Sequence, residues 1–579
     1  MLIACAAERA SAQSTSLIAG GLTALPPVTN GPNLVQNGGF ETLGGGLPAG
    51  WTGSSAWAMD QLVRHGGTFS YRRGTGAPTA AQTVQLRPGI YRLSAWVRTQ
   101  SLGSSGTGVR LTLDFRPGGV NDWVPSEVIS GTRDWTRVEV GPVVITANRT
   151  AAVQLESYNN PTGTAWFDDV ELRQELPPAV DVFMKYPNFR GMLFDDQSQT
   201  LRFDVTVTPP GDDFGRHRVR TTLTDEASGA TVNTQTFAAA ASVEATLDGG
   251  GMQAGRAYLA RVALVDAGTG AVVSTYPAYR VSRVPGSARA SMNVSFDERN
   301  RVLVRGTPRF VLGLYDSGSS YSTSQAFWDN QLWSASGERR LSGINFNFYL
   351  NYWYGHATTE AMRSLMDSLQ QHGVMYLQTA NCFDSGAAAG ASFAIDTSDS
   401  YVQSLGTHPG SAGVYTIDEC KPALVPGAFT QYQRLKRLDP DSVTFAALLG
   451  GADVRLWRDA ADLISTDPYP MYGAEPAGGY RHNQVADWTV NARDAVKDSR
   501  PFMTVLQFFQ FTSQGRWPTR QEMRNHAYMA IVEGARGLWW WSLGDNALRN
   551  VCSGWCTQKT QYMDNLRAVV NELAALEPA

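Results

Sequence analysis

The chain has 579 residues, which is too long for one hydrophobic core and indicates about three or four domains of ~150 residues each. A net charge of only -4 excludes the strongly basic surface of a nucleic-acid-binding or polybasic membrane-surface protein. No segment offers ~20 apolar residues free of charge, so we expect no membrane span. The 57 glycines, 16 tryptophans and 21 tyrosines favour β-rich folds with flat aromatic faces.

The first residues, MLIACAAERASAQS, contain small side chains and a Leu-x-x-Cys pattern that ends at Cys5. We interpret residues 1–32 as the remnant of an export signal of the lipoprotein type followed by a linker, with a lipid anchor at Cys5. This interpretation predicts a bacterial protein that is secreted or held at the cell surface.

Two of the five cysteines, Cys552 and Cys556, lie close together in the loop-like stretch CSGWC. A local disulfide in an oxidising compartment and two free thiols are both compatible with this spacing. A zinc site is not expected, because no further Cys or His accompanies the pair.

Short alternating strands separated by glycine occupy residues 33–175, as in YRLSAWVRTQ and VRLTLDF, and they predict an antiparallel β-sandwich. The segment opens with NLVQNGGFE and closes with TAWFDDVEL. With these end motifs it resembles the jelly-roll carbohydrate-binding modules, in which the two ends meet at a structural calcium ion. The resemblance implies Glu41 and Asp169 as metal ligands, and carboxylate oxygens suit calcium.

The aromatic residues of this segment divide by their local pattern. Trp96 lies within an alternating strand, so we expect it in the core. Trp57, Trp123 and Tyr158 lie near turns rich in Gly or Asn and are our candidates for contact with a sugar. The module could equally be a packing domain without a ligand.

Residues 178–285 form a second β-rich unit, with alternation in LRFDVTVTP, HRVRTTLTD and AYLARVALVD. The pattern predicts an immunoglobulin-like β-sandwich. No cluster of titratable residues stands out in this unit, so we interpret it as a spacer that orients its neighbours.

From residue 291 to residue 579 apolar runs alternate with helical patterns, which predicts a (β/α)8 TIM barrel. The runs are RFVLGLYD, INFNFYLNYW, VMYLQTANCFD, GVYTIDE, VTFAALLGG, LISTDPYP, PFMTVLQFFQF and GLWWWSLGD. The last long helix is expected to begin at Pro518, with Thr519 and Glu522 as a capping box. The whole chain is thus predicted to be a multidomain protein of mixed β and α/β class.

Catalysis in such barrels takes place at the carboxyl ends of the strands, so the polar residues that close each run are the natural site candidates. As contacts for substrate we expect Tyr315, Asp316, Asn351, Trp353, Asn381, Tyr469, Gln507 and Trp540. Carboxylates, amides and aromatic rings dominate this rim, and a cluster of Lys, Arg or His is missing from it. Such a rim suits neutral, polyhydroxylated rings and suits phosphate or hydride chemistry poorly.

Glycosidic bond cleavage needs a carboxylic acid and a second carboxylate. The setting of Glu419, GVYTIDEC, resembles the fourth strand end of the large glycoside-hydrolase superfamily of βα barrels, where an Asn-Glu or Asp-Glu pair carries the acid/base. The resemblance implies that Glu419 is the proton donor. It implies no catalytic metal or organic cofactor.

The superfamily pattern places the second carboxylate, a nucleophilic Glu, at the end of the seventh strand. This chain departs from the pattern, because it has Gln507 there. We rank Asp467 first as its replacement, because some retaining α-glycosidases place their pair on strands four and six. Asp316 is the second alternative. Asp418 is the third, since neighbours on a strand face opposite sides unless the strand end bends.

The sequence therefore predicts a glycoside hydrolase that cleaves an extracellular poly- or oligosaccharide. The alternative is a catalytically silent glycan-binding protein that has lost the nucleophile of the seventh strand. A barrel acting on a non-glycan substrate is a third hypothesis, which the shortage of metal ligands and of Ser or Cys nucleophile motifs disfavours.

Overall fold

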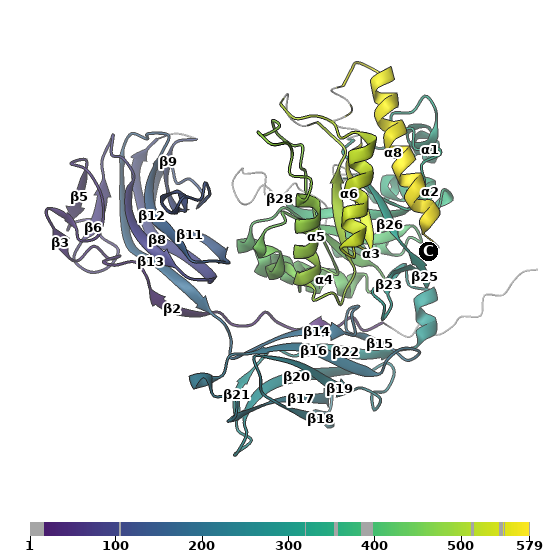
Figure 1. Ribbon diagram of the computed structural model, residues 1–579, viewed down its shortest axis with the longest axis horizontal. Coiled ribbons are helices and arrows are strands. Elements are labelled where there is room, and N and C mark those ends of the chain that lie inside the picture. The colour runs from purple at the N-terminus through teal and green to yellow at the C-terminus, as the bar shows by residue number, and fades with distance from the viewer. Residues whose placement is uncertain are drawn as a thin grey trace, which may run out of the picture.

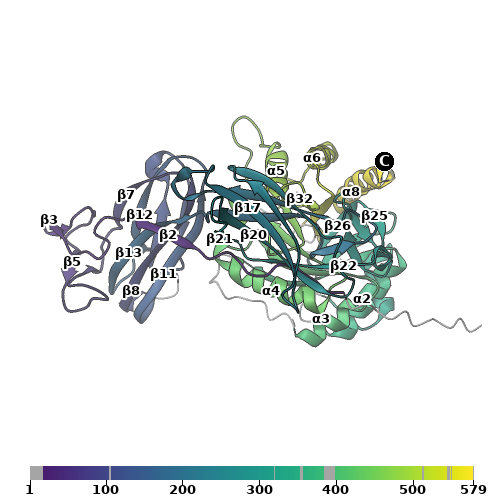
Figure 2. The same cartoon turned by 90° about the horizontal axis from the view of Figure 1, so that it is seen from below.

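The computed structural model describes residues 17–103, 106–318, 320–351, 357–383, 398–510, 514–543, 548 and 551–577, with backbone alone for residues 380–383. Two β-sandwiches and a barrel make up the chain. The N-terminal sandwich stands beside the barrel, and the second sandwich lies beneath both (Figure 1; Figure 2 shows the view from below).

The N-terminal sandwich consists of a four-stranded sheet in the order β10-β9-β12-β7 and a six-stranded sheet, β11-β8-β13-β6-β5 with β2 on β13. One core of buried aliphatic and aromatic side chains lies between the two sheets. The predicted antiparallel sandwich is confirmed. Its elements are β2 (Thr29–Asn33), β3 (Leu43–Gly44), β4 (Leu47–Pro48), β5 (Trp57–Asp60), β6 (Ser70–Arg73), β7 (Ala80–Leu86), β8 (Gly89–Leu102), β9 (Gly108–Asp114), η1 (Arg116–Gly118), β10 (Trp123–Pro125), β11 (Gly131–Ile145), β12 (Arg149–Tyr158) and β13 (Thr164–Leu176).

The second sandwich packs the three-stranded sheet β14-β16-β19 against a larger sheet, β1-β22-β20-β17-β18 with β15 and β21 at its sides. Strand β1 comes from residues 17–32, so this part of the expected leader and linker belongs to the folded unit. The elements are β1 (Gly21–Leu22), β14 (Val180–Tyr186), β15 (Met192–Phe194), β16 (Thr200–Val207), η2 (Pro210–Asp212), β17 (His217–Asp225), β18 (Thr231–Ala238), β19 (Ser242–Asp248), β20 (Ala257–Asp266), β21 (Val272–Thr275), β22 (Tyr279–Val284) and η3 (Gly286–Ala290).

Eight parallel strands close into a barrel, and the first pairs with the last, so the predicted TIM-barrel architecture is confirmed. The barrel strands are β26 (Val311–Asp316), β27 (Phe348–Asn351), β28 (Met375–Phe383), β29 (Ser411–Asp418), β30 (Val443–Leu448), β31 (Leu463–Thr466), β32 (Phe502–Gln507) and β33 (Gly537–Leu543). A small sheet of β23 (Val294–Phe296), β24 (Val302–Val304) and β25 (Thr307–Arg309) precedes them.

The helices around the barrel are α1 (Gln325–Trp333), α2 (Thr359–Gln371), α3 (Asp399–Gly406), η5 (Pro422–Leu424), α4 (Val425–Leu438), η6 (Ala452–Trp457), α5 (Gln484–Ala495), α6 (Arg520–Val532) and α8 (Thr557–Leu576). Between β30 and β31 the chain forms only the short 3-10 helix η6, so the strict alternation with α-helices fails there. Helix α6 has the predicted reciprocal capping box of Thr519 and Glu522, but it begins at Arg520 and not at Pro518, which precedes the N-cap. Among the described residues, no helix is long and apolar enough to cross a membrane.

The second sandwich packs against the amino-terminal end of the barrel, the end opposite to the carboxyl ends of the strands. Phe189 and Met192 of the sandwich share one hydrophobic cluster with Val311, Met375 and Leu463, which stand at or beside the starts of barrel strands. The carboxyl ends, where we expect chemistry, face away from this interface.

A buried ion pair joins the second sandwich to the barrel. The Arg190 guanidinium lies 2.8 Å from Asp462, which directly precedes β31, and both side chains are at most 2% exposed. The Tyr432 hydroxyl and the Thr444 backbone N–H also donate to Asp462, each at 2.8 Å. The pair is therefore fully hydrogen-bonded, which is what makes a buried charge tolerable.

We expect Arg190→Met to destabilise the protein by about 3–5 kcal/mol, because it leaves the Asp462 carboxylate buried without its counter-charge. Urea unfolding followed by tryptophan fluorescence measures this change. The matched control is Arg434→Met, which breaks the more exposed pair with Asp399 and should cost about 0–1 kcal/mol. Equal stability of Arg190→Met and the wild type would show that the Arg190 pair does not hold the two units together.

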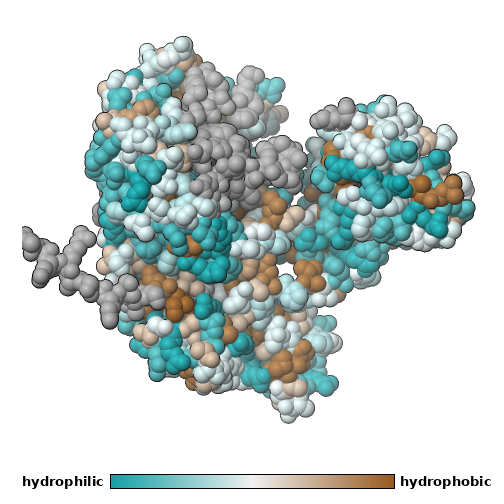
Figure 3. All heavy atoms as spheres, turned by 180° about the vertical axis from the view of Figure 1, so that it is seen from behind, coloured by the Kyte–Doolittle hydropathy of each residue, from teal (hydrophilic) through white to brown (hydrophobic). Residues whose placement is uncertain are grey.

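Cys552 and Cys556 form a disulfide, which decides between the two alternatives for the CSGWC stretch. Cys420, which follows the end of β29, is also disulfide-bonded. Seen from behind, the described surface is largely hydrophilic over both sandwiches, with hydrophobic residues in small separate patches (Figure 3).

Candidate active site

Strand β29 bends at its carboxyl end. Its pairing with β30 shifts register between Tyr415 and Ile417, and Glu419 has a left-handed backbone with a φ of 48°. The Glu419 N–H nevertheless bonds to the carbonyl of Ala447 at 2.9 Å, so the turn is held in place. A non-glycine residue in this conformation stores strain of a kind that clusters at functional sites. Because the strand bends here, Asp418 and Glu419 do not point to opposite faces.

Asp467, the residue that follows β31, meets Glu419 at this rim. Its side chain is 3% exposed and is hydrogen-bonded to the carboxyl of Glu419. Burial raises the pKa of Asp467 well above its usual value, and the charges of Glu419 and Asp418 raise it further. Its Oδ1 is buried without a hydrogen-bond partner in the described part of the chain. Burial and the neighbouring negative charges thus favour the protonated form of Asp467.

Asp418 completes a group of three carboxyl groups from β29 and β31. The Tyr415 hydroxyl donates to Asp418 at 2.7 Å. The Tyr315 ring lies edge-on to that of Tyr415, with ring centres 5.6 Å apart, and its pKa is raised by burial and by the nearby carboxylates. Tyr315 is 2% exposed and packs inside the barrel, so it supports the site from within and does not present a ring to substrate.

The Asp316 carboxylate is occupied by contacts within the protein. Its carboxylate is fully buried, forms an ion pair with Arg339 at 3.0 Å, and accepts hydrogen bonds from the Tyr349 hydroxyl and the Gly318 N–H. Arg339 lies 23 residues further along the chain, so this pairing was not visible in the local sequence. These contacts occupy the carboxylate and remove the reason for considering Asp316 as the second catalytic group.

Gln507 and Asn351 are buried at the ends of their strands and bond to the backbone. Gln507 accepts from the Met471 N–H at 3.0 Å and donates to the carbonyl of Phe509 at 3.1 Å. Its amide therefore ties the loop after β31 to the segment after β32. Asn351 donates to the carbonyl of Gly318 at 3.2 Å. Both had been expected to contact substrate, and these bonds give them positioning roles.

The three successive tryptophans of β33 point in different directions. Trp539 packs inside the barrel, and Trp540 is fully buried in the layer between barrel and helices. The prediction that Trp540 forms the floor of a sugar subsite is wrong, because strand alternation turns it away from the barrel axis. Trp541 is only partly buried, and its ring lies 4.8 Å from that of Phe509 and 6.2 Å from that of Tyr469.

An aromatic wall, which we define as Tyr469, Tyr472, Phe509 and Trp541, thus stands at the ends of β31, β32 and β33. Tyr472 is 46% exposed, and its ring centre lies 6.2 Å from that of Phe509. Of this set the sequence singled out Tyr469, and within the tryptophan run, of which at least one ring was expected to stack on a sugar, it favoured Trp540 over Trp541. Side chains alternate along a strand, so Trp541 lies on the same face as Trp539 and closer to the carboxyl end of β33. This alternation would have favoured Trp541 over Trp540. Trp353 and the side chain of Asn381 lie outside the described residues.

In the N-terminal sandwich, Glu41 and Asp169 lie against one loop. Glu41 accepts the backbone N–H of Thr68 at 2.8 Å, and Asp169 bonds to the ring of His65 at 2.7 Å. A Cβ added at Gly66 would meet Asp169, and one added at Gly67 would meet Glu41. The loop therefore forms a tight cradle around both carboxylates. Among the described residues, no group of three or more His, Cys, Asp or Glu side chains is arranged so that it could hold a metal ion by side chains alone.

The aromatic candidates of this sandwich are placed differently from the prediction in two cases. Trp57 is buried, stacks near Tyr71 and donates to the carbonyl of Pro78 at 2.7 Å, so it belongs to the core. Trp96, expected in the core, is partly exposed. Trp123 is 44% exposed, and with Tyr158 it lies on the four-stranded sheet.

No protein-family model matches the chain, and no curated protein matches it. Solved structures with similar organisation include a GH2 beta-galacturonidase from Eisenbergiella tayi bound to galacturonate, at 12% identity and a TM-score of 0.34, covering 90% of this chain and 97% of that one. A beta-glucuronidase from an uncultured Clostridium sp. has 10% identity and a TM-score of 0.32, with 98% and 100% coverage.

The beta-glucuronidase of Parabacteroides merdae has 10% identity and a TM-score of 0.30 over 80% of this chain, which spans only 61% of the length of that protein. The module TmCBM61, solved in complex with beta-1,4-galactotriose, has 23% identity and a TM-score of 0.19, covering 25% of this chain and all of its own length.

Proposed function

We propose that the chain is a glycoside hydrolase whose catalytic pair is Glu419 and Asp467. The observation that carries this proposal is the hydrogen bond between their carboxyl groups at the carboxyl ends of β29 and β31. A buried carboxyl group whose protonated form is favoured, in contact with a second carboxyl group, supplies the acid and the carboxylate that glycosidic cleavage requires.

Burial assigns the roles within the pair. Because burial raises the pKa of Asp467 and favours its protonated form, Asp467 serves as the general acid. Glu419, which is less buried, then serves as the carboxylate that attacks the anomeric carbon. This assignment exchanges the roles expected from the sequence, where Glu419 was the proton donor. Asp418 adds negative charge that helps keep the proton on Asp467.

We further propose that the reaction retains the anomeric configuration. An inverting enzyme separates its carboxyl groups by ~6.5–9.5 Å to hold a water molecule, whereas a retaining enzyme needs only ~5–5.5 Å. Carboxyl groups in hydrogen-bond contact are closer than either separation, so they must part to admit a substrate, and the shorter, retaining separation is the one nearer to this geometry. Attack by Glu419 therefore forms a glycosyl ester, and the departing oxygen takes the proton of Asp467; water then hydrolyses the ester with Asp467 as the base.

The aromatic wall supports a neutral saccharide as the substrate. The partly exposed rings of Tyr469, Tyr472 and Trp541 suit the apolar faces of pyranose rings, and they stand on the same side of the barrel as the pair. Phe509 is 1% exposed and only packs against these three rings. The sugar and its linkage are fixed by contacts that these four rings alone do not define.

A catalytically silent glycan-binding protein is the second candidate function. It is favoured by Gln507, whose amide is tied to two backbone groups where the superfamily has its nucleophile. Such a protein would hold glycans at the aromatic wall without cleaving them.

The experiment that separates these functions is reducing-sugar release from a panel of plant, fungal and bacterial polysaccharides, with the wild type and Glu419→Gln in parallel. The proposal expects release from at least one polysaccharide by the wild type, and none above background by Glu419→Gln. Binding without any release by the wild type would establish the silent protein instead.

We also propose that the cradle of Glu41 and Asp169 binds a structural calcium ion, with backbone carbonyls as its other ligands. Calcium at 100 times its Kd should then stabilise the N-terminal sandwich by about 2.7 kcal/mol. Thermal unfolding with added calcium and with EDTA measures this effect. Asp169→Asn should unfold at the same temperature in both solutions, and an equal response of variant and wild type would place the ion elsewhere.

Finally, we propose that the protein is exported from a bacterial cell and acts on extracellular polysaccharide. The Cys552–Cys556 disulfide supports an oxidising compartment. Cys5, the expected lipid attachment site, lies outside the described residues.

A further inference from the structure

The turn that carries Glu419 is attached to a disulfide. Cys420 directly follows Glu419 and is disulfide-bonded. Since Cys552 and Cys556 bond to each other, the bond of Cys420 ties this turn to a different part of the chain. The Cys420 side chain is only 5% exposed and belongs to the hydrophobic cluster between the barrel strands and the helices. None of the functions assigned above uses this bond.

Strand β29 leaves its regular pairing on both sides just before this turn. Its pairing with β30 shifts register between Tyr415 and Ile417. Its pairing with β28 shifts register over the same two residues. A bulge of this kind disrupts the ladder of hydrogen bonds locally and bends the strand. The direction in which the Glu419 carboxyl points therefore depends on contacts that are made after the bulge.

Two contacts hold the backbone of this turn. Glu419 has a φ of 48°, a conformation that residues with a Cβ rarely adopt, and its N–H donates to the carbonyl of Ala447 at 2.9 Å. The Cys420 sulfur makes the second contact. It accepts the N–H of Asp418 at 3.4 Å and lies 3.6 Å from the carbonyl oxygen of the same residue. The sulfur thus contacts the backbone on the far side of Glu419, and the disulfide restrains the position of that sulfur.

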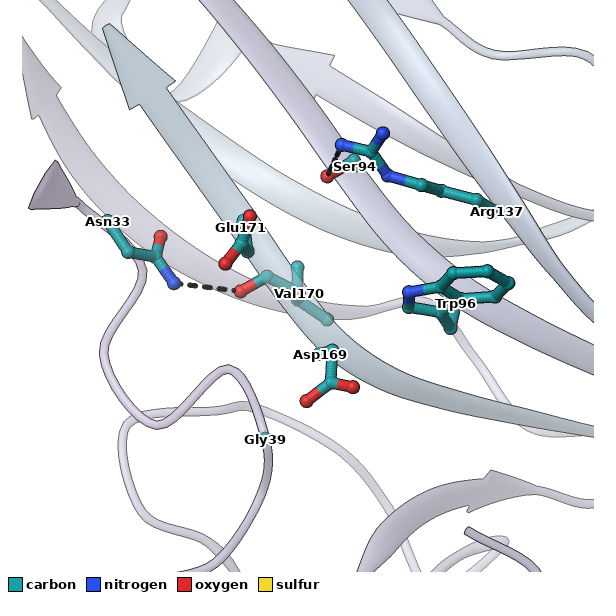
Figure 4. A pocket seen from close by; sticks show the side chains of 8 residues that line it. All are labelled: Asn33, Gly39, Ser94, Trp96, Arg137, Asp169, Val170 and Glu171. Atoms are coloured by element: carbon teal, nitrogen blue, oxygen red, sulfur yellow. Dashed lines mark hydrogen bonds between the residues drawn. The ribbon is translucent and has the colours of Figure 1, made fainter. Parts of the chain in front are cut away.

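Asp169 shows how the protein holds the same backbone conformation elsewhere. Its φ is 47°, and it lies on β13 at a point where the pairing of that strand is also irregular (Figure 4). There the Asp168 carboxylate accepts the N–H of Asp169 at 2.8 Å, together with two N–H groups of a neighbouring loop. A sulfur atom is a much weaker acceptor than a carboxylate. At Glu419 the covalent bond of Cys420 therefore supplies the restraint that a carboxylate supplies at Asp169.

We propose that the Cys420 disulfide is a positioning element of the active site, which holds the Glu419 carboxyl against Asp467 and so sets the rate of attack on the anomeric carbon. The inference rests on the proposed function for the role of Glu419. Displacing a reacting group by about 1 Å can cost about 10²-fold in rate. Cys420 acts only through its neighbour, because its own side chain is buried in the hydrophobic cluster.

The kinetic test is Cys420→Ala, with kcat and KM measured on the susceptible polysaccharide. We expect kcat to fall by about 10–100-fold, because Glu419 is no longer held in line for attack, and KM to stay within about twofold of the wild type. The matched control is Cys552→Ala. It also breaks one disulfide of the barrel and leaves one free thiol, but it does so in the partly exposed loop between β33 and α8. Both of its parameters should equal those of the wild type.

A double-mutant cycle with Asp467→Asn tests the same contact without any substrate. Part of the effect of Asp467→Asn on the Tm at pH 7 comes from the charge of Glu419, which lies in contact with Asp467. This part should be lost when Glu419 is released, so Asp467→Asn should change the Tm less in the Cys420→Ala background than in the wild type. In the Cys552→Ala background the full change should remain.

Wild-type kcat in Cys420→Ala would overturn the proposal, as would an equal loss in Cys552→Ala, a rise in KM alone, or an equal effect of Asp467→Asn on the Tm in all three backgrounds. Cys420→Val fills more of the space left by the sulfur and replaces Cys420→Ala if circular dichroism shows that the alanine variant is unfolded. Failure of the proposed function is distinguishable, because the wild type would then release no sugar while the cycle still reported the contact.

Discussion

Glu419→Gln should reduce hydrolysis of the susceptible polysaccharide by at least about 10³-fold. The amide keeps the size of the side chain and can still bond to Asp467, but it cannot attack the anomeric carbon. The loss should be the same for an aryl glycoside with a dinitrophenolate leaving group, because the missing step is nucleophilic attack. Initial rates on both substrates measure the effect.

The matched control for this variant is Glu475→Gln, an exposed residue in the loop between β31 and α5. It removes the same charge from the same end of the barrel without touching the pair, so its rates should equal those of the wild type. Substantial activity of Glu419→Gln on either substrate would exclude Glu419 as the nucleophile and move that role to Asp418.

Unlike Glu419→Gln, Asp467→Asn should lose activity to an extent that depends on the leaving group. Its rate on polysaccharide should fall by about 10²–10⁴-fold, because the departing oxygen no longer receives a proton. Its rate on the dinitrophenyl glycoside should fall far less, since that leaving group needs no protonation. Equal losses on the two substrates would show that Asp467 only positions Glu419.

The same substitution should raise stability at neutral pH. Burial raises the pKa of Asp467 above its unfolded value, so the folded state resists ionisation and stability declines as pH rises from about 4 towards the raised pKa. Asparagine carries no charge and avoids this penalty. Asp467→Asn should therefore have a higher Tm than the wild type at pH 7, and the difference should disappear near pH 4. If Asp467→Asn had a lower Tm than the wild type at pH 7, burial would not disfavour the ionised form of Asp467 as we infer.

The barrel and the two sandwiches could be predicted because their patterns are local. The alternation along β8, the continuous apolar run of β29 and the capping box of Thr519 and Glu522 depend only on neighbours in sequence. The same alternation determines the orientation of Trp96. Because Ala95 and Val97 point into the core, Trp96 must point outward. The prediction placed Trp96 in the core because it lies within an alternating strand, without asking on which face of the strand it falls.

The site was only partly predictable because its decisive features are not local. The bend after Tyr415 that turns Asp418 and Glu419 to one side is invisible in GVYTIDEC. The burial that places the proton on Asp467 depends on strands that close the barrel far along the chain. Asp316 failed as a candidate for the same reason, since its partner Arg339 belongs to a later segment.

The most direct test of the catalytic pair is covalent trapping with the 2-deoxy-2-fluoro dinitrophenyl glycoside of the sugar that the wild type releases. Mass spectrometry of the intact protein and of its peptides should show one glycosyl adduct, located on Glu419, and label formation at a similar rate in the wild type and in Asp467→Asn, because dinitrophenolate departs without a proton from Asp467. An adduct on another carboxylate, or full hydrolytic activity without any adduct, would contradict the retaining mechanism that places Glu419 as nucleophile and Asp467 as acid.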